Sequence, residues 1–132
     1  FRLHAEGCYY YGSTPMTWAD ANSACVGMTA NLVVIETDAE RHFVDAFADI
    51  PYQYPDEESL SVWLGATDAV TEEEWLWVTG DSVGVDGWLA GSPKNSAAAD
   101  DHMCVYNLLG VELRYVWDDA DGTALLPYFC EM

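Results

Sequence analysis

The first third of the chain contains a segment with apolar side chains at helical spacing. Between Thr17 and Cys25, the side chains of Trp18, Ala21 and Cys25 recur every three or four residues, which places them on one face of a helix. A Ser or Thr before this run can cap its first turn. Gly27 follows closely and is expected to end the helix.

A second helix is predicted to begin at Thr37 and Asp38, which cap it. Pro51 and Pro55 break it, because proline lacks a backbone donor and clashes with the preceding turn. An acidic, Tyr-rich loop then runs to about Ser59. The expected apolar face of this helix consists of Ala39, Phe43, Val44 and Phe47.

Short runs of β-branched and aromatic residues, bounded by turn residues, predict strands. The first run is expected to end in a turn at Gly12 and Ser13. The predicted strands are Cys8 to Tyr11, Asn31 to Ile35, Val62 to Ala66, Trp75 to Val78, Met103 to Leu108, Arg114 to Trp117 and Tyr128 to Glu131. Two early helices followed by several strands predict an α+β arrangement in a single domain over residues 1–132.

One long segment has neither helical nor strand periodicity. From Thr79 to Asp101 the chain consists mostly of Gly, Ser, Ala, Asp and Pro. Loops of this length inside a compact domain are usually functional. We therefore expect the binding residues to lie in or beside this loop.

The charge of the chain is strongly negative. Twenty-three carboxylates and four cationic side chains give a formal net charge of −19. Nucleic acids and anionic membrane surfaces are therefore poor partners, because their phosphates would be repelled. The excess of acid indicates either simple solubility or the binding of cations.

The cysteines indicate an oxidising compartment. The four residues Cys8, Cys25, Cys104 and Cys130 show no C-x-x-C spacing, which argues against a zinc site. No apolar run approaches the roughly 20 residues that a membrane span needs. The chain begins at Phe1, and either a removed signal peptide or an arbitrary start of the fragment would explain this. We expect a secreted, soluble protein.

Taken in order from Cys8 to Met132, these runs resemble the C-type lectin domain family. The matching phrases are Cys8-Tyr9-Tyr10-Tyr11, Thr17-Trp18-Ala19-Asp20-Ala21, Asn31-Leu32-Val33-Val34-Ile35, Trp63-Leu64-Gly65, Trp75-Leu76-Trp77-Val78-Thr79-Gly80 and Tyr128-Phe129-Cys130-Glu131. The resemblance implies two helices packed on antiparallel sheets with a long binding loop. Tryptophans are mainly expected in the core, namely Trp18, Trp63, Trp75, Trp77 and Trp88.

The resemblance also implies how the cysteines are used. Cys25 and Cys130 should pair and join the first helix to the last strand. The family partners of Cys8 and Cys104 are absent from this chain. The two residues are left either to join each other or to remain available, and an unpaired Cys8 would suit a bond between chains. We expect a disulfide-linked homodimer, or a link to a related subunit.

In sugar-binding members of the family, a triplet in the long loop and a later W-N-D segment hold a Ca²⁺ ion that binds the sugar. Here the triplet is Ser92-Pro93-Lys94, and Asp118 and Asp119 keep the later pair. Serine supplies fewer oxygen ligands, and a lysine ammonium opposes a divalent cation. A further ligand could come from Asp100 or Asp101, and His102 is expected to be a bystander. The primary calcium site is therefore doubtful.

Two interpretations of this loop remain open. Either the site has decayed, or Lys94 pairs with Asp118 or Asp119, replaces the ion and leaves a calcium-independent sugar pocket. Tyr106 and Tyr115 are candidate stacking faces for such a pocket. N-acetylated sugars suit it, because the amide offers a donor, an acceptor and a methyl group. The full expected carbohydrate-binding set is Ser92, Pro93, Lys94, Asn95, Asp101, Tyr106, Asp118 and Asp119.

A second calcium position resembles the auxiliary site of mannose-binding members. The segment Thr67-Asp68-Ala69-Val70-Thr71-Glu72 supplies Asp68 and Glu72, and Asn95 falls where another ligand would lie. Carboxylate and amide oxygens are the ligands that Ca²⁺ prefers. The alternative is a solvated acidic turn without a metal.

The resemblance implies a carbohydrate-binding lectin, such as a soluble defence or agglutinating protein of innate immunity. The alternative is a lectin-like domain that binds protein, ice or mineral. An enzyme is not expected, because His4, His42 and His102 lie in unrelated segments and no nucleophile has a recognisable setting.

Overall fold

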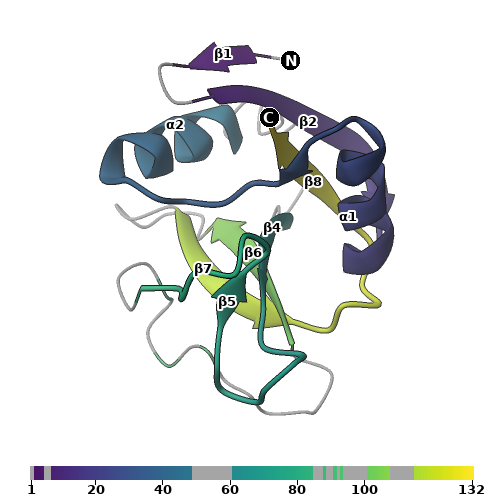
Figure 1. Ribbon diagram of the computed structural model, residues 1–132, viewed down its shortest axis with the longest axis vertical. Helices are drawn as coiled ribbons and strands as arrows, with labels where there is room; N and C mark the ends of the chain where they lie inside the picture. The colour runs from purple at the N-terminus through teal and green to yellow at the C-terminus, as the bar shows by residue number, and fades with distance from the viewer. Residues whose placement is uncertain are drawn as a thin grey trace.

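The computed structural model describes residues 2–4, 7–48, 61–84, 88, 91, 93, 101–107 and 115–132. Both helices lie with strands β1, β2 and β8 in one half of the molecule, and β4 to β7 lie in the other half (Figure 1). The two ends of the chain lie at the same end of the molecule, near the first strands.

Helix α1 spans Trp18–Gly27 and is capped as predicted. The hydroxyl of Thr17 accepts a hydrogen bond from the Asp20 amide at 3.2 Å. The buried residues of α1 are Ala21 and Cys25, so its predicted inner face is confirmed.

Helix α2 spans Asp38–Ala48, and the Thr37 hydroxyl accepts a hydrogen bond from the Glu40 amide at 3.1 Å. Val44 is buried, as its place on the predicted apolar face requires. The prediction for Ala39 is wrong, because its side chain is exposed in the first turn. The side chain of Phe47 lies outside the described residues.

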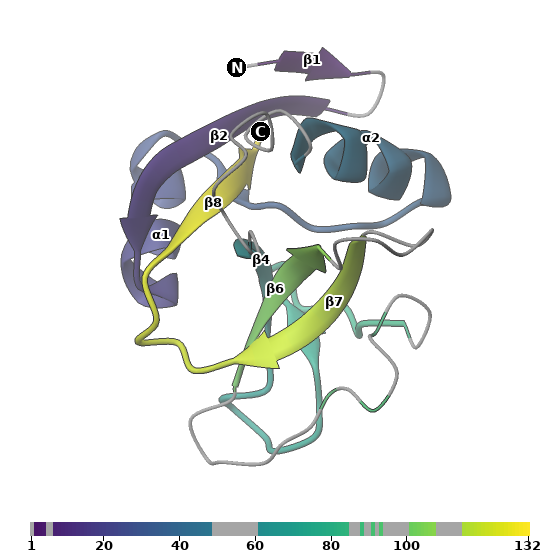
Figure 2. The same ribbon diagram turned by 180° about the vertical axis from the view of Figure 1, so that it is seen from behind.

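In the part of the chain that the structure describes, eight strands form a single sheet. They are β1 (Arg2–His4), β2 (Gly7–Met16), β3 (Asn31–Leu32), β4 (Ser61–Thr67), β5 (Leu76–Trp77), β6 (His102–Asn107), β7 (Tyr115–Ala120) and β8 (Leu126–Glu131). The main order is β1-β2-β8-β4-β6-β7, with β3 on β8 and β5 on β4. Seen from behind, β2 and β8 lie side by side with α1 beyond them (Figure 2). The α+β prediction is confirmed, although β4 and β8 run parallel, which an all-antiparallel expectation missed.

The predicted turn at Gly12 and Ser13 is wrong, because β2 continues through both residues. Gly12 is needed for a different reason. A Cβ atom at this position would collide with the ring of Tyr128 on the neighbouring strand β8. The glycine therefore makes room for a packed aromatic ring within the sheet.

Other strand ends also differ from their predicted positions. The run after Asn31 is a strand only as far as Leu32, although the Val33 amide still donates to the Phe129 carbonyl of β8 at 2.9 Å. β7 extends beyond Trp117 to Ala120, because Asp118 and Asp119 pair with β6 despite their charge.

The core is rich in tryptophan and contains the predicted disulfide. Trp63, Trp75 and Trp77 are buried, whereas Trp18 and Trp88 are half-buried. Cys25 and Cys130 are bonded, with their Cα atoms 5.4 Å apart, so α1 is tied to β8.

Candidate metal and carbohydrate site

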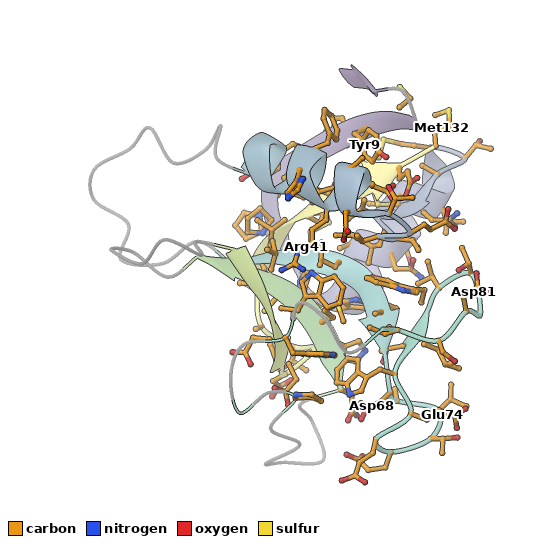
Figure 3. The ribbon with its side chains drawn as sticks, turned by 90° about the vertical axis from the view of Figure 1, so that its left-hand side faces the viewer. Tyr9, Arg41, Asp68, Glu74, Asp81 and Met132 are labelled. Atoms are coloured by element: carbon orange, nitrogen blue, oxygen red, sulfur yellow. A yellow bond between two sulfur atoms is a disulfide. The ribbon has the colours of Figure 1, made fainter. Side chains whose placement is uncertain are left out.

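Three carboxylates meet where β4 ends and β6 begins. Asp68 and Glu72 lie in the turn after β4, and Asp101 directly precedes β6. One carboxylate oxygen from each residue lies within 4.8 Å of one from each of the others. Asp68 lies at the end of the molecule opposite Tyr9 and Met132 (Figure 3).

The pairing of β4 with β6 brings these carboxylates together. Thr67 of β4 lies opposite His102 of β6, so the next residues outward are Asp68 and Asp101. The Asp68 amide donates to the Asp101 carbonyl at 3.1 Å, which continues the pairing by one step. The Glu73 amide donates to Oδ2 of Asp68 at 2.9 Å and fixes that carboxylate. Glu73 holds a left-handed conformation with φ of 67°, which is uncommon for a residue other than glycine.

The electrostatics of this cluster favour a cation. Asp68 is only 1% exposed, and its Oδ1 has no hydrogen-bond partner among the described residues; nor has Oδ1 of Asp101. Burial and the charge of Asp101 raise the pKa of Asp68, although the Glu73 amide opposes the shift. Desolvation and the charges of Asp68 and Asp101 likewise raise the pKa of Glu72. Buried oxygens with free lone pairs and unbalanced charge fit a Ca²⁺ ion, which takes several oxygen ligands.

The sequence placed Asp101 in the sugar site, whereas the structure brings it to Asp68 and Glu72. The strand pairing that joins them is long-range and could not be read from local pattern. A usable signal was nevertheless present, because Asp101 immediately precedes a predicted strand and Asp68 immediately follows one. Asn95, the third predicted ligand, lies outside the described residues.

Asp118 and Asp119 are neighbours in β7, so their side chains point to opposite faces of the sheet. Opposite them on β6 are Cys104 and Met103. Neighbouring side chains on a strand point to opposite faces, so Asp118 shares a face with Cys104 and Asp119 shares a face with Met103. Asp119 is 6% exposed, and its amide donates to Oδ1 of Asp118 at 3.0 Å.

The other expected sugar-site residues are described only in part. Ser92 and Lys94 lie outside the described residues, and Pro93 between them is half-buried. Tyr106 and Tyr115 lie in β6 and β7, but their side chains are not described. Along β7, Tyr115 is three residues from Asp118, or about 10 Å at the usual rise of a strand.

Indole rings from Trp75, Trp77, Trp88 and Trp117 pack against one another in a layer. Trp88 contacts Trp75 and Trp117, with ring centroids 5.0 and 6.2 Å apart. Trp117 also contacts Trp77 at 5.7 Å and lies beneath the guanidinium of Arg41 at 5.4 Å. Trp117 and Trp88 form an isolated bridge, so this part of the loop is held against β7.

A groove of about 460 Å³ opens beside this layer. Its walls are the start of α2 with Arg41, and the loop from Asp81 to Gly84. Figure 3 shows Arg41 between the helices and the lower strands, with Asp81 at one edge. His102, the expected bystander, lies away from this groove against the ring of Trp18, 4.6 Å between centroids.

Neither Cys8 nor Cys104 takes part in a disulfide, so they do not join each other. Cys8 is half-buried in β2, one strand from the edge of the sheet. Cys104 is buried, and its Sγ lies 3.6 Å from the Asp118 carbonyl oxygen. Cys8 is therefore the more accessible of the two.

Among the described residues, neither helix has the length and apolar character required to cross a membrane.

Comparison with known proteins identifies the family. The "Lectin C-type domain" family matches residues 14–132. The mouse protein C-type lectin domain family 4 member E is 30% identical over all of this chain and 58% of its own length. Human lithostathine-1-beta is 36% identical over 69% of this chain and 53% of its own length.

The chain thus spans little more than half the length of these curated relatives. Among solved structures, the C-type lectin CEL-I from Cucumaria echinata has a TM-score of 0.83 and 25% identity, covering 98% of this chain and 92% of that one. The chain belongs to the C-type lectin domain family.

Proposed function

We propose that this domain binds carbohydrate through its long loop with little or no dependence on calcium for sugar contact. The family is one of carbohydrate-binding domains, and it is generally non-enzymatic. The proposal that sugar contact needs little or no calcium rests on the triplet Ser92-Pro93-Lys94. It replaces two oxygen ligands and adds a positive charge where the family holds its ion.

The register of β7 favours Asp119 over Asp118 as the carboxylate that pairs with Lys94. Asp119 shares a strand face with Trp117, and Trp117 is the residue that Trp88 of the long loop contacts. Asp119 is also nearly buried, so a cation beside it would interact more strongly than with an exposed carboxylate. An ammonium at this point would supply both a counter-charge and hydrogen-bond donors to sugar hydroxyls.

We propose in addition that calcium binds at the auxiliary site of Asp68, Glu72 and Asp101. These residues would hold the ion, and its two positive charges would offset most of the charge of three adjacent carboxylates and order the start of β6. The role is structural and separate from sugar contact. N-acetylated sugars remain our proposed ligand class for the pocket.

Sugar binding should survive EDTA and depend on Lys94. Lys94→Met should weaken affinity by roughly 5- to 150-fold, equivalent to about 1 to 3 kcal/mol, because a buried carboxylate loses its partner. Lys94→Arg is the matched control that keeps the charge and should retain most of the affinity. Glycan-array screening with and without EDTA, followed by calorimetry on the best ligand, measures both effects.

Lys94→Asn should behave differently, since it restores an amide ligand and should shift binding toward calcium dependence. Loss of wild-type binding in EDTA, or normal binding by Lys94→Met, would show that the ion rather than the lysine holds the sugar.

We also propose a secreted, disulfide-linked dimer. Non-reducing electrophoresis should show a dimer that reductant converts to monomer, because Cys8 is a half-buried free thiol near the edge of the sheet. Cys8→Ser should run as a monomer. Cys104→Ala is the matched control and should remain dimeric, since Cys104 is buried. A wild-type chain that is monomeric without reductant contradicts the proposal.

A further inference from the structure

A buried carboxyl group lies where α2 meets the sheet, far from the acidic cluster at Asp68. Glu40 is only 2% exposed. Its Oε1 accepts a hydrogen bond from the Tyr9 hydroxyl at 2.7 Å, and its Oε2 accepts one from the Glu36 amide at 2.7 Å. Both oxygens therefore act as hydrogen-bond acceptors.

A second carboxyl group reaches the first from the last strand. Glu131 lies in β8 between Tyr9 of β2 and Asn31 of β3. One of its oxygens, Oε2, accepts a hydrogen bond from the Val34 amide at 3.2 Å. Its carboxyl also lies within hydrogen-bonding reach of Glu40. Two carboxyl groups in contact share a proton more readily than they both ionise.

No basic side chain that the structure describes faces Glu131; Arg2 of β1 lies opposite Tyr9, one strand further away, and its side chain is outside the described part. β2 presents Tyr9, β3 presents the neutral Asn31, and the segment before α2 presents the carboxylate of Glu36. A hollow of about 180 Å³ opens beside Glu131, and none of the residues lining it is basic. Arg41, next to Glu40 in α2, lies over Trp117 instead. Burial, followed by the charges of Glu40 and Glu36, raises the pKa of Glu131 to about 7.

We propose that Glu131 and Glu40 share a proton and so hold the start of α2 against β8, and that this contact weakens as the pH rises through neutrality. Glu131 carries the proton and donates it to Glu40. The same carboxyl accepts from the Val34 amide, so the pair holds the segment between β3 and α2 as well as the helix. Loss of the proton leaves two adjacent negative charges without a cation.

The direction of the pH effect follows from the protons bound in each state. The unfolded chain releases the Glu131 proton near pH 4.5, whereas the folded chain keeps it until about pH 7. The stabilisation is therefore complete below about pH 4.5 and is lost as the pH rises toward 7. As the proton is lost, the unfolding equilibrium constant should rise by at most about 300-fold, and by less to the extent that solvent screens the half-exposed Glu131 carboxyl.

The test compares wild type with Glu131→Gln by urea unfolding between pH 4.5 and 7.5, in EDTA so that the Asp68 cluster holds no metal. Glutamine keeps the acceptor for Val34 and a donor for Glu40 but cannot ionise. Over this range its unfolding constant should rise less than that of wild type, by a factor of at most about 100. Glu74→Gln, which removes an exposed carboxylate elsewhere, should follow the wild-type curve.

A carboxyl-carbon NMR titration gives an independent readout in the folded protein. Glu131 should titrate near pH 7. The inference is overturned if this carboxyl titrates near its ordinary value of about 4.5, or if Glu131→Gln keeps the full pH dependence of wild type.

Discussion

Replacing Cys25 and Cys130 together by alanine should lower the free energy of unfolding by about 4 to 5 kcal/mol. The bond joins residues 105 apart, and a cross-link that closes so long a loop removes much of the entropy of the unfolded chain. A single domain is typically stable by about 5 to 15 kcal/mol, so the variant should lie close to its unfolding threshold at 37 °C. Urea unfolding of both proteins measures the difference.

Cys104→Ala separates the cross-link from the loss of a buried sulfur atom. Cys104 is buried like Cys25 and Cys130 but forms no disulfide. Its replacement should cost only about 1 kcal/mol, which is typical of a point mutation. The contrary result is an unfolding free energy of the double variant within about 1 kcal/mol of wild type. That result would mean that the unfolded chain is already as restricted without the bond as with it.

Calcium at one hundred times its dissociation constant should raise the free energy of unfolding by about 2.7 kcal/mol, because it binds the folded chain alone. The expected rise in melting temperature is roughly 8 °C for a domain of this size. Asp68→Asn should abolish this response, since it removes the buried carboxylate oxygen that has no other partner among the described residues. Scanning calorimetry with calcium and with EDTA measures the shift.

Without calcium, Asp68→Asn should not lower the free energy of unfolding, and this provides a second check. Burial raises the pKa of Asp68, so its ionisation at neutral pH costs stability, and the neutral amide should be at least as stable as wild type in EDTA. Glu74→Gln removes an exposed carboxylate of the same turn and should keep the calcium response. If millimolar calcium does not stabilise wild type, the three carboxylates do not form a calcium site.

Several features could be predicted because they depend on neighbours along the chain. Helix caps at Thr17 and Thr37 are local, since a hydroxyl bonds an amide three residues later. The bond between Cys25 and Cys130 followed from the resemblance to the family. Strand ends were less accurate, as at Gly12, because a glycine in a turn and a glycine under an aromatic ring look alike in sequence.

The sequence by itself determined the α+β class, the two helices and the acidic turn at Asp68, because periodicity, caps and short motifs are local properties; the disulfide came from the resemblance to the family. Only the tertiary structure decided that Asp101 joins Asp68 and that Glu40 meets Glu131. Each of those pairs is brought together by strand or helix packing across more than thirty residues. Such contacts depend on register between distant elements, which local pattern does not specify.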